Sequence, residues 1–242
     1  MRRTNLRASV ISALLIASTA QAPAGDTANL DILGFSADGS IFAFEEYGIQ
    51  DGSGFPYANR YYIDTATDSF VAGSPIRVRS EEDGADLVQA RQNVSAKGEA
   101  IVEDAELKAH SGFTAGYHSL AQVGGDPHQM TLRPRAIFPP IDEPITISLV
   151  EQMFPALESC SGLSDEASGF TLKMRIGDAE SRLLHQDKSV PESRICPLGY
   201  SIQAVQTFYP KQGNPVFAVI IAVRRVGFEG PDHRFIAVTG KL

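Results

Sequence analysis

The feature that most constrains the fold is an Asp-Gly turn between two apolar runs near the start of the chain. Asp38-Gly39 separates Ile32–Phe35 from Ile41–Phe44. Glycine adopts a positive φ without a Cβ clash, so an Asp-Gly pair between apolar runs is a strong signal of a β-hairpin. Phe42 and Phe44 share one face of the second predicted strand, whereas its other face can contact solvent.

Two further strands are predicted after a glycine-rich loop. The loop spans Gly48 to Gly54, which contains three glycines and no apolar run. Tyr61-Tyr62-Ile63 then forms a third strand. Asp64 to Asp68 carries Asp and Thr side chains, which can hydrogen-bond their own backbone in a turn. A fourth strand begins at Phe70-Val71 and is broken by a Gly-Ser-Pro sequence.

This order of strands and turns resembles one blade of a TolB-type β-propeller. Phe35-Ser36-Ala37-Asp38-Gly39 and Tyr62-Ile63-Asp64 carry the resemblance, which covers residues 30–79. A propeller typically needs four to eight blades, and the sequence contains no second copy of the pattern. The resemblance therefore implies a partial propeller-like sheet and not a complete propeller.

The chain also resembles a bacterial family of predicted secreted proteins of unknown function. The segments FAFEEYGIQDGSGFPY and GFEGPDHRF, residues 42–57 and 227–235, carry this resemblance. It extends over most of the chain after the N-terminal segment. The resemblance implies export from the cytoplasm, and it supplies no catalytic residues.

The first residues have the pattern of a targeting segment. Arg2, Arg3 and Arg7 form a basic start, and the apolar stretch Ala8–Ala17 is too short for an ordinary transmembrane helix. We therefore expect a signal peptide over residues 1–24, a periplasmic or secreted location, and no membrane span after its removal. The alternative interpretation is a disordered or core N-terminus.

The segment 80–97 predicts the one helix of the chain. Apolar residues recur at helical spacing between Leu87 and Val94. Ser80 can cap its N-terminus, and the acidic residues after it suit the positive end of the helix dipole. Gly98 is placed to end the helix.

The remainder of the chain predicts β-strands. They are expected at Met130–Leu132, Ala136–Phe138, Ile145–Val150, Phe170–Ile176, Arg182–His185, Ser201–Tyr209, Val216–Val226 and Phe235–Val238. Val216 to Val223 is almost continuously apolar, which predicts a central strand covered on both faces. We therefore expect a mainly β protein of antiparallel sheets, sandwich-like or partly propeller-like, with one short helix.

Length and charge narrow the organisation and the partners. Pro139-Pro140 divides the mature chain into two β-rich regions, 25–138 and 139–242, and the alternative is one continuous domain. The formal net charge of -8 makes nucleic acid a poor partner. A hydrophobic fraction of 43% is sufficient for a globular core.

Cys160 and Cys196 are the only cysteines of the chain. In an exported protein an even number of cysteines favours a disulfide. A metal site would need further ligands, and the sequence has no C-x-x-C spacing. The sequence therefore predicts a Cys160–Cys196 disulfide, and it predicts neither a metal site nor a cofactor.

The candidate binding residues lie around the glycine-rich loop. Glu45, Glu46 and Asp51 could supply oxygen ligands to Ca²⁺, although their spacing does not match an EF-hand and carboxylates also keep edge strands soluble. Phe55 and Tyr57 could form a recognition surface, because exposed aromatic side chains mark binding sites. The alternative is that these aromatic residues belong to the core.

No catalytic motif is present in the sequence. The five histidines lack H-E-x-x-H and H-x-H spacing, and no G-x-S-x-G elbow occurs. We therefore favour a non-catalytic binding or envelope-interaction module, with a protein or small molecule of the cell envelope as its partner. The alternative is a periplasmic hydrolase in which His185 or His233 meets a carboxylate and a serine only in the fold.

Overall fold

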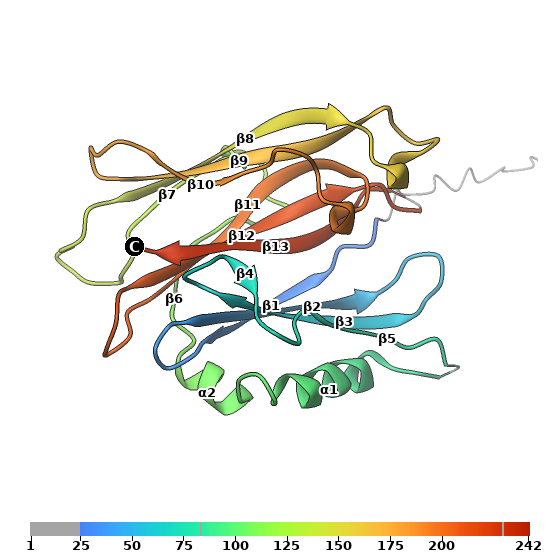
Figure 1. Ribbon diagram of the computed structural model, residues 1–242, viewed down its shortest axis with the longest axis horizontal. Helices are drawn as coiled ribbons and strands as arrows, with labels where there is room; N and C mark the ends of the chain where they lie inside the picture. The colour runs from blue at the N-terminus through green and yellow to red at the C-terminus, as the bar shows by residue number, and fades with distance from the viewer. Residues whose placement is uncertain (1–24, 83, 229) are drawn as a thin grey trace, which may run out of the picture.

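The computed structural model describes residues 25–82, 84–228 and 230–242. The signal peptide expected over residues 1–24 lies outside the described residues. Three antiparallel sheets stack in layers, and the helices cover the outer face of the lower sheet (Figure 1). The sheets do not close into a barrel or a propeller. The prediction of a mainly β, antiparallel fold that is not a complete propeller is therefore confirmed.

The lower and upper sheets each consist of consecutive strands, whereas the middle sheet combines β6 with the last three strands of the chain. The lower sheet contains β1 (Asn29–Phe35), β2 (Ile41–Ile49), β3 (Pro56–Asp64), β4 (Ser69–Phe70) and β5 (Ile76–Arg79). The middle sheet contains β6 (Phe113–Tyr117), β11 (Pro197–Phe208), β12 (Val216–Arg225) and β13 (Asp232–Lys241). The upper sheet contains β7 (Gln129–Leu132), β8 (Ile145–Pro155), β9 (Glu166–Ile176) and β10 (Arg182–Gln186).

The predicted Asp-Gly hairpin joins β1 to β2. Gly39 has a φ of 75°, and the Asp38 carboxylate accepts hydrogen bonds from Ser36 Oγ at 2.8 Å and from the Ser40 N–H at 2.9 Å. The turn thus satisfies its own polar groups, as Asp and Ser side chains do in tight turns. This hairpin is confirmed.

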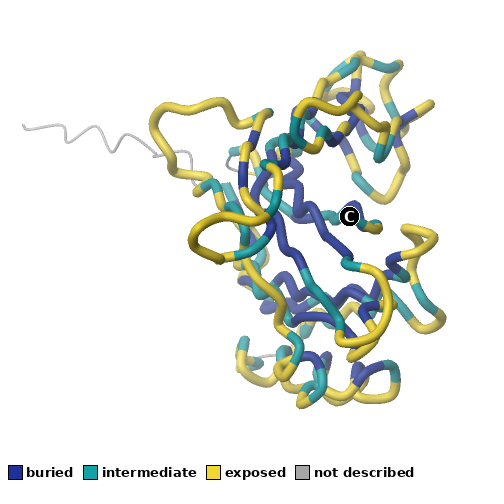
Figure 2. The backbone as a smooth tube through the Cα atoms, turned by 90° about the vertical axis from the view of Figure 1, so that its left-hand side faces the viewer, coloured by how far each residue is buried: buried dark blue, intermediate teal, exposed yellow. Residues whose placement is uncertain are grey.

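Strand β12 is covered on both faces, as its apolar run predicts. Val219 and Ile221 enter the core between the middle and upper sheets, whereas Ile220 and Ala222 enter the core between the middle and lower sheets. Successive strand residues point to opposite faces, so only a continuous apolar run can fill two cores at once. Figure 2 shows the resulting run of buried backbone through the centre of the molecule.

Two helices, α1 (Leu87–Gly98) and α2 (Asp104–Ala109), pack on the lower sheet. The prediction of Ser80 as the N-cap is wrong, because Asp86 accepts the Gln89 N–H at 2.7 Å and the helix begins at Leu87. Gly98 ends α1 as expected. Helix α2 has six residues, too few to produce a periodic apolar pattern. No helix in the described residues is long and apolar enough to cross a membrane.

One further expectation for the central part of the chain is wrong. Ala136–Phe138 is not a strand: Arg135 pairs with Asp142 at 2.5 Å and closes a loop in which Phe138 is 94% exposed. The strands β6 and β7 precede Pro139 but pair with β11 and β8, which follow it. The two predicted regions therefore share the middle and upper sheets.

The predicted disulfide is confirmed. Cys160 and Cys196 are joined, with their Cα atoms 5.0 Å apart and both residues fully buried. The bond connects the 3₁₀ turn Glu158–Cys160 to the start of β11, in a small core with Ala167 and Val190. A second 3₁₀ turn, Glu192–Arg194, lies immediately before Cys196 in the chain.

Candidate functional site

Glu45 and Glu46 are adjacent in β2 and therefore point to opposite faces of the lower sheet. The Glu45 side chain is fully buried and accepts Arg60 Nε at 2.7 Å and Arg91 Nε at 2.6 Å. Arg60 also donates to Asp104 at 2.5 Å. Because Arg91 belongs to α1 and Asp104 to α2, this ionic network fixes both helices to the sheet.

The Glu46 carboxylate faces the middle sheet and is also fully hydrogen-bonded. Its Oε1 accepts the Tyr61 hydroxyl at 2.7 Å and Asn59 Nδ2 at 3.0 Å. Its Oε2 accepts the backbone N–H of Phe235 in β13 at 2.9 Å. Glu46 thus connects the lower sheet to the edge of the middle sheet.

The other predicted site residues are not gathered around these carboxylates. Asp51 and Phe55 are half-buried in the loop between β2 and β3. Tyr57 is 6% exposed, donates its hydroxyl to Asp26 at 3.2 Å, and lies under the Arg234 guanidinium at 4.7 Å. Within the described part of the chain, no three His, Cys, Asp or Glu side chains form a group that could hold a metal ion.

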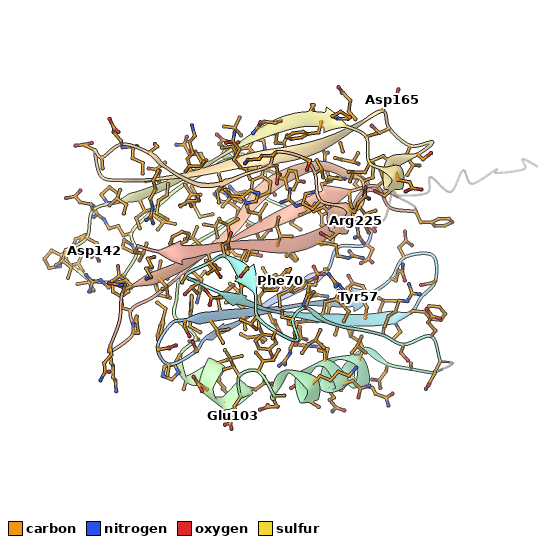
Figure 3. The ribbon with its side chains drawn as sticks, viewed as in Figure 1. Tyr57, Phe70, Glu103, Asp142, Asp165 and Arg225 are labelled. Atoms are coloured by element: carbon orange, nitrogen blue, oxygen red, sulfur yellow. A yellow bond between two sulfur atoms is a disulfide. The ribbon has the colours of Figure 1, made fainter. Side chains whose placement is uncertain are left out.

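A groove follows the outer edge of β13 and is called the β13 groove below. It has a volume of about 620 Å³. One wall belongs to the lower sheet and includes Asp68 and Arg77, and the other is the loop around Ile195 that joins β10 to β11. Residues Phe235–Val238 of β13 line it directly. Figure 3 labels Phe70 and Arg225, which also line it, near the boundary between the middle and lower sheets.

The edge of β13 is partly closed by carboxylates. The Phe235 N–H donates to Glu46, and the Thr239 N–H donates to Asp68 Oδ1 at 2.7 Å. Backbone groups of alternate residues face the same side of a strand, so Ala237 also directs its N–H and C=O outward between these two positions. Among the described residues, none donates to or accepts from Ala237 on this side. Ala237 is half-buried and lines the groove.

Both described non-glycine residues with a positive φ line this groove. Asp68 has a φ of 52° and Ile195 a φ of 59°. Asp tolerates this region, but it is a genuine outlier for a β-branched residue such as Ile. Strain of this kind costs about 1–3 kcal/mol per residue and clusters at functional sites. The conformation of Ile195 is held between the Glu192–Arg194 turn and the disulfide at Cys196.

The upper wall of the groove carries a buried ionic cluster. Asp187 pairs with Arg194 at 2.5 Å and with His185 Nε2 at 2.9 Å, and accepts the Phe170 N–H at 2.8 Å. Burial opposes ionisation of Asp187, but these three hydrogen bonds outweigh it and hold its pKa at about 2. Arg194 also donates to the Tyr200 hydroxyl at 3.2 Å. This cluster is internally satisfied.

Two other arginines lack a carboxylate at hydrogen-bond distance. The Arg225 side chain is 18% exposed, and its Nη2 lies 3.7 Å from Asp232 Oδ2. Burial and the neighbouring Arg234 lower the Arg225 pKa. Arg77 is exposed and lies 6.0 Å from the centre of the Tyr61 ring. An anion entering the groove can therefore bind guanidinium groups without displacing a bonded carboxylate.

Sequence reasoning missed most of the residues of this groove. Asp68 had the signature of a turn residue, and Ala237 lies inside an ordinary apolar strand. They meet because β13 lies along the lower sheet, so the contact between Asp68 and Thr239 spans 171 positions of sequence. A pattern within a short segment of sequence cannot predict a contact between residues so far apart. Of the five predicted binding residues, Glu46 alone lines the groove.

Comparison with known proteins identifies a family that the chain matches. A family model described as "Predicted secreted protein (DUF2259)" matches residues 43–241, a range that runs from within β2 to the end of β13. Neither the curated proteins nor the solved structures contain a match to this chain.

Proposed function

Because the chain belongs to this family of predicted secreted proteins, we propose that it is an exported, non-catalytic binding module whose ligand site is the β13 groove. One observation carries the proposal. The groove combines both positive-φ non-glycine residues of the described chain with an edge-strand backbone group that has no partner there. Strained positions and unpaired polar groups in a concave site are typical of ligand binding.

The predicted binding residues contribute to this proposal unequally. Glu46 shapes the groove by holding Phe235, and Tyr57 supports it indirectly by packing against Arg234, which lines the groove. Glu45 is turned toward the helices. Asp51 and Phe55 belong to the neighbouring loop, and a binding role for them stays a prediction.

A fragment screen observed by protein NMR tests the groove as a ligand site. With a library of several hundred small molecules, we expect the amide shift changes to concentrate on Phe70, Ile195 and Ala237. Phe70 is 53% exposed on the rim, so Phe70→Ala should weaken these responses with little change in stability. Phe228→Ala is the control, because Phe228 is 80% exposed outside the groove. Shift changes spread evenly over other surfaces would contradict the proposal.

A hydrolase is the second candidate, and one local arrangement favours it. His185 bonds Asp187 in the upper wall, and the exposed Ser193 lines the same groove. However, no hydrogen bond joins Ser193 to His185 in the described residues, and Asp187 is also paired with Arg194. A nucleophilic serine needs a base within hydrogen-bond reach.

Labelling with a fluorophosphonate probe separates the two candidates. A binding module should remain unlabelled under conditions that label a control serine hydrolase. Labelling that disappears in Ser193→Ala, but persists in Ser181→Ala, would establish the hydrolase instead. Ser181 is a suitable control because it is exposed and lies outside the groove.

A further inference from the structure

We infer that the β13 groove binds the C-terminal end of a short extended peptide: Ala237 pairs with the peptide backbone, and Arg77 and Arg225 receive its terminal carboxylate. This inference rests on the groove being the ligand site, as proposed above. Three features of the groove define the ligand class. They are the unpaired N–H and C=O of Ala237 in β13, the positive charge of the walls, and the apolar side chains at the rim.

The edge of β13 offers one backbone pairing site and no more. Ala237 presents both a donor and an acceptor, which is what an added strand requires. The next outward donors, Phe235 and Thr239, are occupied by Glu46 and Asp68. A long added strand would have to break both of these bonds. A short segment centred on Ala237 breaks neither, so the ligand has only a few residues in contact.

The walls select a negative charge. The chain has a formal net charge of -8, but arginines outnumber carboxylates among the side chains of the groove, with Arg77, Arg194, Arg225 and Arg234 against Glu46 and Asp68. Arg194 and Arg234 are paired with Asp187 and Asp26. Arg225 has only the longer contact with Asp232 at 3.7 Å, so it and the exposed Arg77 can hydrogen-bond a ligand. Both lie close enough to Tyr61 for their charges to oppose the burial that raises its pKa.

The rim favours an apolar side chain on the ligand. Phe70 is 53% exposed on the lower-sheet side, and Ile195 is 41% exposed on the upper-sheet side. Ile236 and Val238 are apolar residues of β13 that line the space. A peptide backbone on Ala237 would direct alternate side chains toward these apolar walls. A simple inorganic anion would use the arginines but would leave this apolar surface in water.

Matched peptides test the inference on the purified mature protein. The probes are N-acetylated tripeptides ending in Ala, Leu, Val or Phe, each as the free acid and as the C-terminal amide. We expect at least one free acid to shift the Ala237 amide resonance in NMR spectra. Its amide should bind about tenfold more weakly in calorimetry, because a charge-assisted hydrogen bond to arginine is lost. Arg225→Gln should remove this discrimination, and Arg224→Gln, outside the groove, should retain it.

The outcomes distinguish failure of the inference from failure of the proposed function. Equal binding of acid and amide would overturn carboxylate recognition. Binding of phosphate alone, without any peptide response at Ala237, would overturn the peptide class. In either case fragment binding at Phe70 and Ile195 would still support the groove as the site. Absence of any response in the groove, to peptides and fragments alike, would overturn both.

Discussion

The Asp68 carboxylate accepts two hydrogen bonds from Thr239, its backbone N–H at 2.7 Å and its Oγ1 at 3.0 Å. This contact joins the turn after β3 to the end of β13. Four residues earlier in β13, the Phe235 N–H donates to Glu46. Exposed strand edges invite pairing with other chains. Glu46 and Asp68 therefore occupy two outward N–H groups of this edge and leave the Ala237 N–H open between them.

Two substitutions of Asp68 should separate the contribution of its hydrogen bonds to stability from the contribution of its charge. Burial raises the Asp68 pKa, so ionisation is disfavoured in the folded protein relative to the unfolded chain. Asp68→Asn keeps an acceptor, tolerates positive φ and removes the buried charge. We expect an unchanged or slightly higher free energy of unfolding at pH 7 in urea titrations. Asp68→Ala should lose about 1–3 kcal/mol, because the Thr239 N–H loses its partner.

The pH dependence supplies the second measurement for Asp68. Because the folded-state pKa is raised, the penalty for burying its charge is absent below the ordinary value of 3.8 and grows as the pH rises through the folded pKa. The advantage of Asp68→Asn over the wild type should therefore shrink on acidification. Asp68→Gly, which relieves the positive φ, controls for backbone strain in the alanine variant. An advantage that grows toward low pH would contradict this account.

Removal of Glu45 should strongly destabilise the protein. Glu45 is fully buried between Arg60 and Arg91, and its loss leaves buried guanidinium charge without a partner. We expect Glu45→Ala to lower the free energy of unfolding by about 3–5 kcal/mol, as for other buried pairs. Glu81→Ala is the matched control, because its partner Arg79 is 51% exposed and surface pairs contribute about 0–1 kcal/mol. Equal losses in urea titrations would reject the ionic network as the support of the helices.

Asp187 should account for part of the loss of stability when the pH falls below about 4. Its pKa of about 2 lies below the ordinary 3.8, so its contribution is complete above pH 3.8 and is lost as the pH falls toward 2. Asp187→Asn should lower the stability at pH 7 and flatten the profile between these values. The measurement is thermal unfolding across pH 2–7. A profile that keeps its slope in the variant would assign acid sensitivity to other groups.

The disulfide should contribute to stability through the unfolded chain. Cys160 and Cys196 are 36 positions apart, and closing a loop of this length corresponds to about 3–4 kcal/mol in the chain-entropy treatment. The double variant Cys160→Ala/Cys196→Ala should lose about that amount in urea titrations. Titration of the denatured, unreduced protein should find no free thiol, and two reactive thiols would refute the bond in the purified material.

Several elements of the fold could be predicted because their signals are local. The Asp38-Gly39 turn, the end of α1 at Gly98 and the double-faced apolar run of β12 each depend on residues close together in sequence. The predicted start of α1 was wrong because Ser80 and Asp86 are both suitable N-cap residues. Which of them caps the helix depends on the path of the chain between β5 and α1, and tertiary packing determines that path.

The sequence by itself determined the antiparallel β class, the hairpins, the cysteine pair and the family of predicted secreted proteins to which the chain belongs. Only the tertiary structure decided that Glu45 and Glu46 serve different cores, and that Asp68, Arg225 and Ile195 border one groove. Turn chemistry and side-chain alternation operate over a few residues. The stacking of sheets depends on how distant apolar faces are buried together, and no short stretch of sequence encodes that arrangement.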